Sequence, residues 1–100
     1  MSGGNWKEMF YAVELGDKEL VAYHLKTGVD PNYQHPEIMA SALVDSIRFN
    51  HLEIAQLLLK FDADPTIKEM MGGDTPMSVA KALNNKDAIA LLKGYIDKKG

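Results

Sequence analysis

One segment of this chain occurs three times at a fixed interval of 34 residues. The clearest copy is residues 50–59, Asn-His-Leu-Glu-Ile-Ala-Gln-Leu-Leu-Leu, and its relatives occupy residues 16–25 and 84–92. Equivalent apolar positions in the three copies are Leu20, Ile54 and Ala88. A period of this length is the signature of a repeat architecture, in which each unit buries its apolar face against its neighbours.

Each unit is predicted to be a pair of helices. The first helix is indicated by apolar residues at i, i+3, i+4 and i+7, namely Trp6, Met9, Phe10 and Val13. Gly16 is expected to end it and Asp17 to cap the next. Further helices are expected at about residues 41–49, 52–60 and 86–96. Another is expected to have Thr75 as its N-cap and Pro76 as its first residue, and to be broken at Asn84-Asn85. Two long loops, residues 33–40 and 67–74, separate the pairs. The prediction is an all-α solenoid of three helix-turn-helix repeats with intervening loops and β-turns.

The composition supports one ordered domain and excludes several functional classes. Apolar residues make up 46% and charged residues 25% of the 100 residues, so a single domain over residues 1–100 is expected. The absence of cysteine excludes disulfides, thiol catalysis and cysteine-bound metal. The net charge is −3 and the lysines are scattered, which disfavours binding to nucleic acid.

No segment predicts membrane insertion or export. The apolar runs are too short to cross a bilayer. Residues 1–5 lack the basic start and apolar run of a signal peptide, and they are expected to form a flexible lead-in. The prediction is therefore a cytoplasmic protein that does not bind membranes.

The repeats resemble those of ankyrin-repeat proteins. That family's signature is approximately T-P-L-H-x-A-A-x-x-G-H-x-E-I-V-x-L-L-L, followed by G-A-D-x-N. Residues 50–59 are similar to its second half, residues 75–80 to its opening, and residues 61–66 more loosely to its exit. The resemblance implies a small, stand-alone protein of three repeats, at about residues 5–36, 37–70 and 71–97.

The chain departs from the family pattern in its loops. The family's opening-helix histidine, which gives hydrogen bonds between neighbouring loops, is replaced by Phe10, Val44 and Ser78. Those bonds are therefore expected to be missing. The repeat length of 34 instead of 33 places one extra residue in each long loop, so looser loops are expected.

The resemblance also implies a partner surface on the loop tips and on the concave side of each opening helix. Residue pairs at commonly used contact positions are Glu14-Leu15, Arg48-Phe49 and Ala82-Leu83. The second member of each pair is large and apolar. We call Leu15, Phe49 and Leu83 the apolar row. Such a row indicates an interaction surface if it is exposed, but it could instead close each helix end against the following helix.

The two long loops supply further candidate contacts. Methionine adapts to irregular partners, which favours contact by Met70 and Met71, although both could fold back over the repeats. The full set of candidate partner-binding residues is Tyr11, Glu14, Leu15, Tyr33, His35, Glu37, Asp45, Arg48, Phe49, Met70, Met71, Ala82 and Leu83.

No motif for catalysis or metal binding is found. His24, His35 and His51 have no paired ligand spacing. His51 occupies the family's loop-supporting position, His24 is expected to be a half-buried packing residue, and His35 to be free on its loop. Asp62 and Asp64 lack the remaining ligands of a calcium loop. Neither a cofactor, a metal nor an enzymatic activity is therefore expected.

The sequence predicts a non-enzymatic protein-binding module that acts as an adaptor or as an inhibitor or immunity-type factor. It is expected to be a monomer with one protein partner of unknown identity. The alternative is a structural protein whose copies associate through the apolar row. A small-molecule or metal-dependent enzyme is the weakest of the three hypotheses.

Overall fold

The computed structural model describes residues 5–99, with Lys99 described by its backbone only, and this part of the chain contains six helices and no strand. Of the lead-in expected at residues 1–5, residues 1–4 lie outside the described residues. The helices are α1 (Trp6–Leu15), α2 (Lys18–Lys26), α3 (Ala42–Arg48), α4 (Leu52–Lys60), α5 (Pro76–Ala82) and α6 (Lys86–Lys99).

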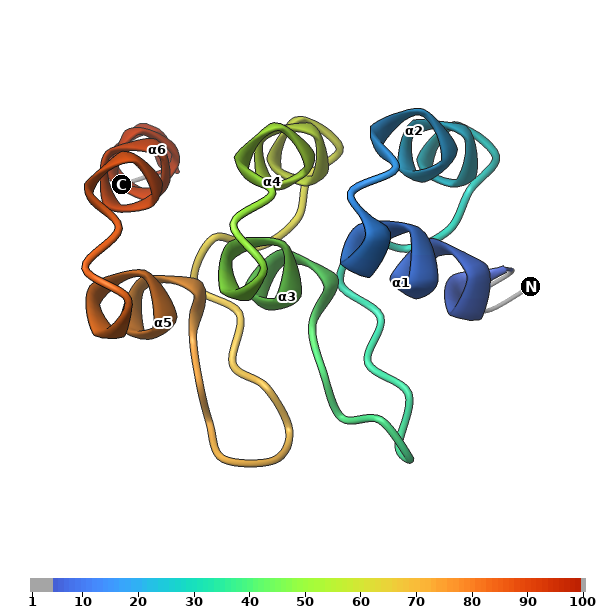
Figure 1. The fold of residues 1–100 in the computed structure, drawn as a ribbon, viewed down its shortest axis with the longest axis horizontal. Coiled ribbons are helices and arrows are strands. Elements are labelled where there is room, and N and C mark those ends of the chain that lie inside the picture. Colours follow the sequence, from blue (N-terminus) through green and yellow to red (C-terminus); the bar gives the residue numbers. More distant parts are fainter. Residues whose placement is uncertain (1–4, 100) are drawn as a thin grey trace.

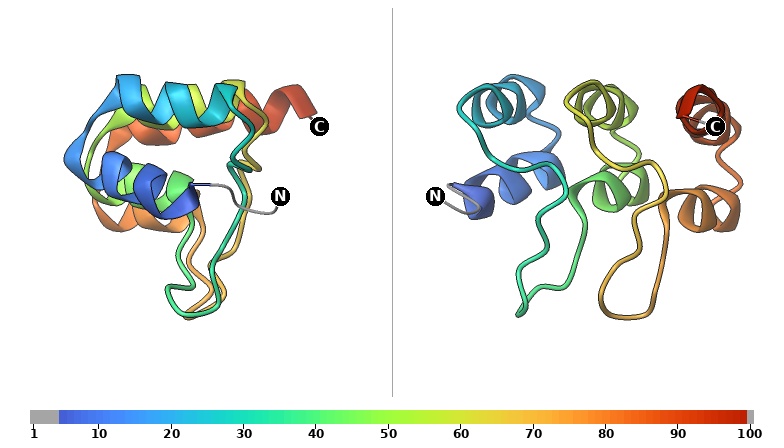
Figure 2. Two further views of the ribbon diagram at one scale, coloured as in Figure 1. Left: turned by 90° about the vertical axis from the view of Figure 1, so that its right-hand side faces the viewer. Right: turned by 180° about the vertical axis from the view of Figure 1, so that it is seen from behind.

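The helices form two layers. Helices α1, α3 and α5 make one layer and α2, α4 and α6 the other, and the two long loops project beyond the first layer (Figure 1). Seen along the stack, the helices of each layer nearly superpose (Figure 2). Each helix contacts its partner within a pair and its counterpart in the next pair. The all-α solenoid predicted from the repeat is confirmed.

The core is shared between neighbouring pairs, as expected of stacked repeats. Its largest fully buried apolar side chains come from the facing sides of both layers, and the set includes Met9, Leu43, Ile47, Ile54, Leu58 and Leu92. Because no pair could bury these side chains alone, the pairs depend on one another for stability.

The helix ends follow from local sequence. Asp17 accepts a hydrogen bond from the amide of Leu20 at the start of α2. Ser41 caps α3 in the same way through the amide of Val44. Thr75 begins α5 with a capping box, in which its side chain and that of Ser78 each accept a bond from the other's amide. These caps fix where α2, α3 and α5 start.

Asparagine performs the role of glycine in the short turn between paired helices. Gly16 has a left-handed backbone with φ of 80°, and the equivalent residues Asn50 and Asn84 have φ of 61° and 53°. Asparagine tolerates this conformation better than most residues. The departure from the family's glycine at Asn50 therefore leaves the turn intact.

The predicted ranges of two helices need adjustment. Helix α3 begins one residue later and ends one residue earlier than the predicted range 41–49, because Ser41 and Phe49 are the capping residues. Helix α6 continues to Lys99, three residues beyond the predicted end. None of the described helices is long and apolar enough to pass through a bilayer.

Candidate protein-binding surface

The apolar row is exposed to solvent. Leu15, Phe49 and Leu83 have exposed fractions of 63%, 45% and 51%. Each lies at the C-terminal end of an opening helix: Leu15 is the last residue of α1, and Phe49 and Leu83 are the C-caps of α3 and α5. The alternative that these side chains close the helix ends in a packed core is therefore wrong.

Both long loops carry side chains that are exposed to solvent. We call residues 33–40 the first finger and residues 67–74 the second finger. On the second finger, Met70 and Met71 are 58% and 68% exposed, so they do not fold back over the repeats. On the first finger, Ile38 and Glu37 are also exposed.

The aromatic residues of the first finger pack against the start of α1. His35 stacks on Trp6, with ring centroids 4.4 Å apart and planes inclined by 18°. Tyr33 lies with its ring centroid 5.7 Å from that of Trp6. The expectation that His35 is free on its loop is wrong, because Trp6 offers it a flat apolar partner. Tyr33 and His35 are both half-buried.

Most other candidates on the helices are exposed, with one exception. Tyr11, Glu14 and Ala82 are open to solvent. Asp45 is only 6% exposed, and it accepts a hydrogen bond from Arg48 one turn later on the same helix. The expectation that Asp45 lies on the surface is therefore wrong. No sequence pattern indicated this burial, since an aspartate in an opening helix normally faces water.

Arg48 joins α3 to the second finger. Its Nη1 donates to Asp45, and its Nη2 lies 3.0 Å from Glu69 Oε1 and 3.6 Å from Asp74 Oδ2. Glu69 is buried, and its other oxygen accepts a hydrogen bond of 3.0 Å from the amide of Ser41. Glu69 is the structural residue that sequence reasoning missed, because nothing in a loop sequence shows that a carboxylate will be buried against a helix start.

The charges in this cluster perturb the ionisation of Asp45. Burial raises the pKa of the Asp45 carboxyl from 3.8 to about 6, and the nearby Glu69 and Glu14 carboxylates add to this rise. Arg48 acts in the opposite direction without overcoming it. The hydrogen bond with Glu69 raises the pKa of Arg48, so the guanidinium stays charged. The guanidinium of Arg48 thus pairs with three carboxylates, those of Asp45, Glu69 and Asp74.

Neighbouring loops are joined by side-chain amides. Gln34 of the first finger donates to the carbonyl of Lys68 and accepts from the amide of Met70, both at 2.9 Å. Asn32 donates to the carbonyl of Asp62 and accepts from the amide of Asp64. The family's histidine is absent from the opening helices, but these amides provide other hydrogen bonds between the loops.

Comparison with known proteins identifies the architecture. A family model described as ankyrin repeats, in three copies, matches residues 9–99. The chain belongs to the ankyrin-repeat family. It is 27% identical over 84 residues to a Fowlpox virus protein named as an ankyrin repeat protein, an alignment that covers 84% of this chain and 14% of the viral protein. Ankyrin repeats are generally protein–protein interaction modules.

A second relative is a glycerophosphocholine phosphodiesterase of Schizosaccharomyces pombe. It is 30% identical over an alignment of 82 residues that covers 78% of this chain and 7% of the yeast protein. The chain therefore spans only a small part of either relative.

The histidines of this ankyrin chain have structural contacts. His51 precedes α4, and its Nε2 lies 3.2 Å from the carbonyl oxygen of Glu14 in the preceding repeat, as a loop-supporting role requires. His24 is fully buried instead of half-buried, with its Nε2 2.8 Å from Glu8 Oε1. Within residues 5–99, no three His, Cys, Asp or Glu side chains are placed to hold a metal ion.

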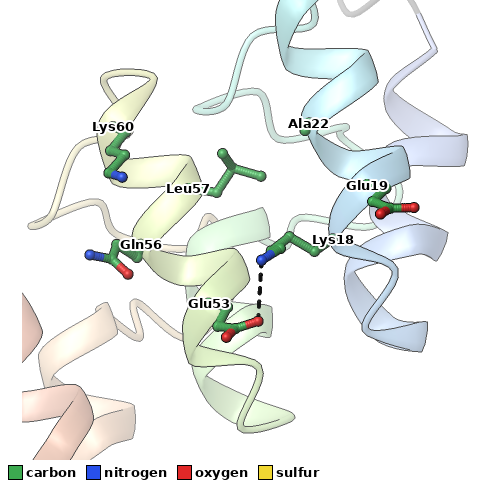
Figure 3. A pocket seen from close by; sticks show the side chains of 7 residues that line it. All are labelled: Lys18, Glu19, Ala22, Glu53, Gln56, Leu57 and Lys60. Carbon is green, nitrogen blue, oxygen red and sulfur yellow. Dashed lines mark ion pairs between the residues drawn. The ribbon is translucent and has the colours of Figure 1, made fainter.

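A hollow between α2 and α4 lies on the layer opposite the fingers. Its walls carry Lys18, Glu19 and Ala22 from α2, and Glu53, Gln56, Leu57 and Lys60 from α4 (Figure 3). Lys18 Nζ and Glu53 Oε1 are 3.4 Å apart across it. Both side chains are largely exposed, so this ion pair contributes little to ankyrin stacking. The hollow offers no cluster of groups for chemistry.

Proposed function

We propose that this ankyrin chain binds a partner protein through the apolar row and the second finger, as an adaptor or an inhibitor. The observation that carries the proposal is the exposure of a large apolar side chain at the same position in all three repeats. Scattered exposed apolar residues are ordinary, but a row of them at equivalent positions in successive repeats suggests an interaction surface.

The proposed anchor is Phe49, the central member of the row. Aromatic side chains near the centre of an interface commonly carry a large share of the binding energy. Burying one fully is worth on the order of 2 kcal/mol. Glu14 and Arg48, which precede Leu15 and Phe49, supply polar groups beside the row. A partner would thus meet an apolar centre with a charged margin.

The proposed mechanism is rigid presentation. The row is carried on helix ends, and the fingers are bonded to each other through Gln34 and to α3 through Glu69. A surface that is ordered before binding loses little conformational entropy when the partner docks. The proposal includes no catalytic step, in keeping with a family whose repeats are typically non-enzymatic.

Affinity capture with two matched variants tests the proposal. Phe49→Asp places a charge on the row, whereas Tyr23→Asp places one at another exposed aromatic residue, on α2 in the other layer. The wild type and Tyr23→Asp are expected to capture the same protein from a lysate of the source organism, and Phe49→Asp is expected to lose it. Equal capture by all three would refute a role for the row.

Light scattering separates this proposal from self-association. A partner-binding protein is expected to keep one monomer mass at all concentrations tested. A mass that rises with concentration in the wild type, but not in Phe49→Asp, would instead assign the row to contact between copies.

A further inference from the structure

The second finger is attached to α3 and its N-cap through Glu69 and Asp74. Glu69 is its only acidic residue that is buried, with an exposed fraction of 6%. One carboxylate oxygen of Glu69 accepts from the amide of Ser41, and the other contacts Arg48. The amide of Glu69 donates to the carbonyl of Asp74 at 2.8 Å, which closes the finger on itself. Glu69 therefore fixes the base from which the exposed Met70 and Met71 project.

The charges around this attachment do not balance. Among the residues that the structure describes, Arg48 is the one cation in contact with Asp45, Glu69 and Asp74. Asp45 lies on α3 beside Arg48, and it is also acted on by Glu69 from the second finger and by Glu14 from α1. Asp45 and Glu69 are both buried, so water screens their mutual repulsion poorly. The single positive charge of Arg48 is therefore divided among these carboxylates.

We propose that Arg48 acts as a clasp that fastens the second finger to α3 through Glu69 and Asp74, and that the charge of Asp45 sets how tightly the clasp holds. When Asp45 is ionised, it shares the guanidinium and repels Glu69. When Asp45 is neutral, its oxygen can still accept from Arg48, but the positive charge acts on the finger alone. Mild acidification therefore tightens the clasp, whereas it weakens an ordinary ion pair.

The raised pKa of Asp45 supports this direction, because it brings the change of charge close to neutral pH. The consequence for binding rests on the proposed function, in which Met70 and Met71 of the second finger contact the partner. A tighter clasp would order these side chains before docking. The clasp itself is a property of the free chain, so it can be measured without a partner.

Amide hydrogen exchange at Ser41 reports the clasp directly, since this amide donates to Glu69. We expect its protection, corrected for the intrinsic exchange rate, to rise on the order of threefold to tenfold between about pH 7.5 and about pH 5. The amide of Ala55, which is bonded within the buried start of α4, serves as the reference for global unfolding. A Ser41 protection that stays constant or falls relative to Ala55 would overturn the proposal.

Asp45→Asn distinguishes the clasp from a general effect of pH. The amide side chain has nearly the same shape and stays neutral, so the variant is expected to show the high Ser41 protection at every pH. A pH dependence that survives in Asp45→Asn would overturn the proposal. If the variant does not fold, the wild-type profile decides alone. Because no partner enters these measurements, failure of the clasp leaves the proposed function standing, and loss of partner binding leaves the clasp standing.

Discussion

The imidazole ring of His51 lies directly against the backbone of Gly16. A Cβ atom on Gly16 would be 2.9 Å from His51 Cε1, which is closer than such atoms approach in folded proteins. The same ring has its Nε2 3.2 Å from the carbonyl oxygen of Glu14. The short turn of the first repeat is thus packed against the residue that begins α4 in the second repeat, and this contact couples the two repeats.

Replacing Gly16 by alanine is expected to lower the free energy of unfolding by about 2–4 kcal/mol. Part of this decrease arises because alanine would have to adopt the left-handed backbone conformation of Gly16, which costs an L-amino acid on the order of 1 kcal/mol. The remainder comes from displacing the His51 ring. Chemical denaturation measures the change. Gly72→Ala is the matched control, because Gly72 has a similar φ of 85° with no atom within 4 Å of the added Cβ. Equal losses in the two variants would contradict a role for the ring contact.

Asp45→Asn is expected to stabilise the protein at neutral pH. Burial raises the pKa of Asp45 from 3.8 to about 6, so the folded chain binds its proton more tightly than the unfolded chain. For this group, the free energy of unfolding therefore falls as pH rises from about 4 to about 6. The asparagine side chain does not ionise, so the variant does not lose this free energy as pH rises. Its free energy of unfolding should exceed that of the wild type by on the order of 2 kcal/mol at about pH 7.

The check is denaturation of both proteins at about pH 7 and about pH 4.5. The free energies of unfolding of the wild type and Asp45→Asn should differ at about pH 7 and become more similar at about pH 4.5. A variant less stable than the wild type at both pH values would show that the charged bond from Arg48 outweighs the burial of Asp45.

Phe49→Asp is expected to leave the fold intact. Its side chain is 45% exposed at the end of α3, and substitutions at such positions usually change stability by less than about 1 kcal/mol. Ile47→Asp, two residues earlier on the same helix, is the contrasting variant. Ile47 is fully buried, so an unpaired charge there should prevent folding at neutral pH. Circular dichroism during thermal melting compares them, and unfolding of Phe49→Asp would place Phe49 in the core.

The sequence predicted the parts of this fold that depend on local chemistry. Gly16 and Asp17 mark the end of α1 and the cap of α2, and Thr75 marks the start of α5, as expected. The register also located the positions of the apolar row. Whether the row was exposed could not be predicted, because a large apolar residue at a helix end is compatible with packing or with exposure.

Contacts between segments far apart in sequence were the parts that could not be predicted. Asp45 and Glu69, which lie more than twenty residues apart, both pair with Arg48, and the stacking of His35 depends on Trp6. Neither pairing leaves a periodic pattern in the chain. Looser fingers were expected from the repeat length of 34, and the missing histidine predicted a loss of hydrogen bonds between neighbouring loops. Gln34 provides such bonds from a position that the family signature does not specify.

Removing the side chain of Gln34 is expected to release the second finger from the first. Gln34→Ala deletes the bonds to the Lys68 carbonyl and the Met70 amide, both of which are on the exposed side of the molecule. Water can replace them, so the free energy of unfolding should fall by only about 1 kcal/mol. The local effect should be larger: the Met70 amide should exchange with solvent faster than in the wild type, while the amides of helix α4 keep their exchange rates.

Gln56→Ala, at an exposed position of α4 in the hollow of Figure 3, is the control and should leave the exchange rate of the Met70 amide unchanged. If Met70 exchanges at the wild-type rate in Gln34→Ala, the two fingers hold their positions independently of each other.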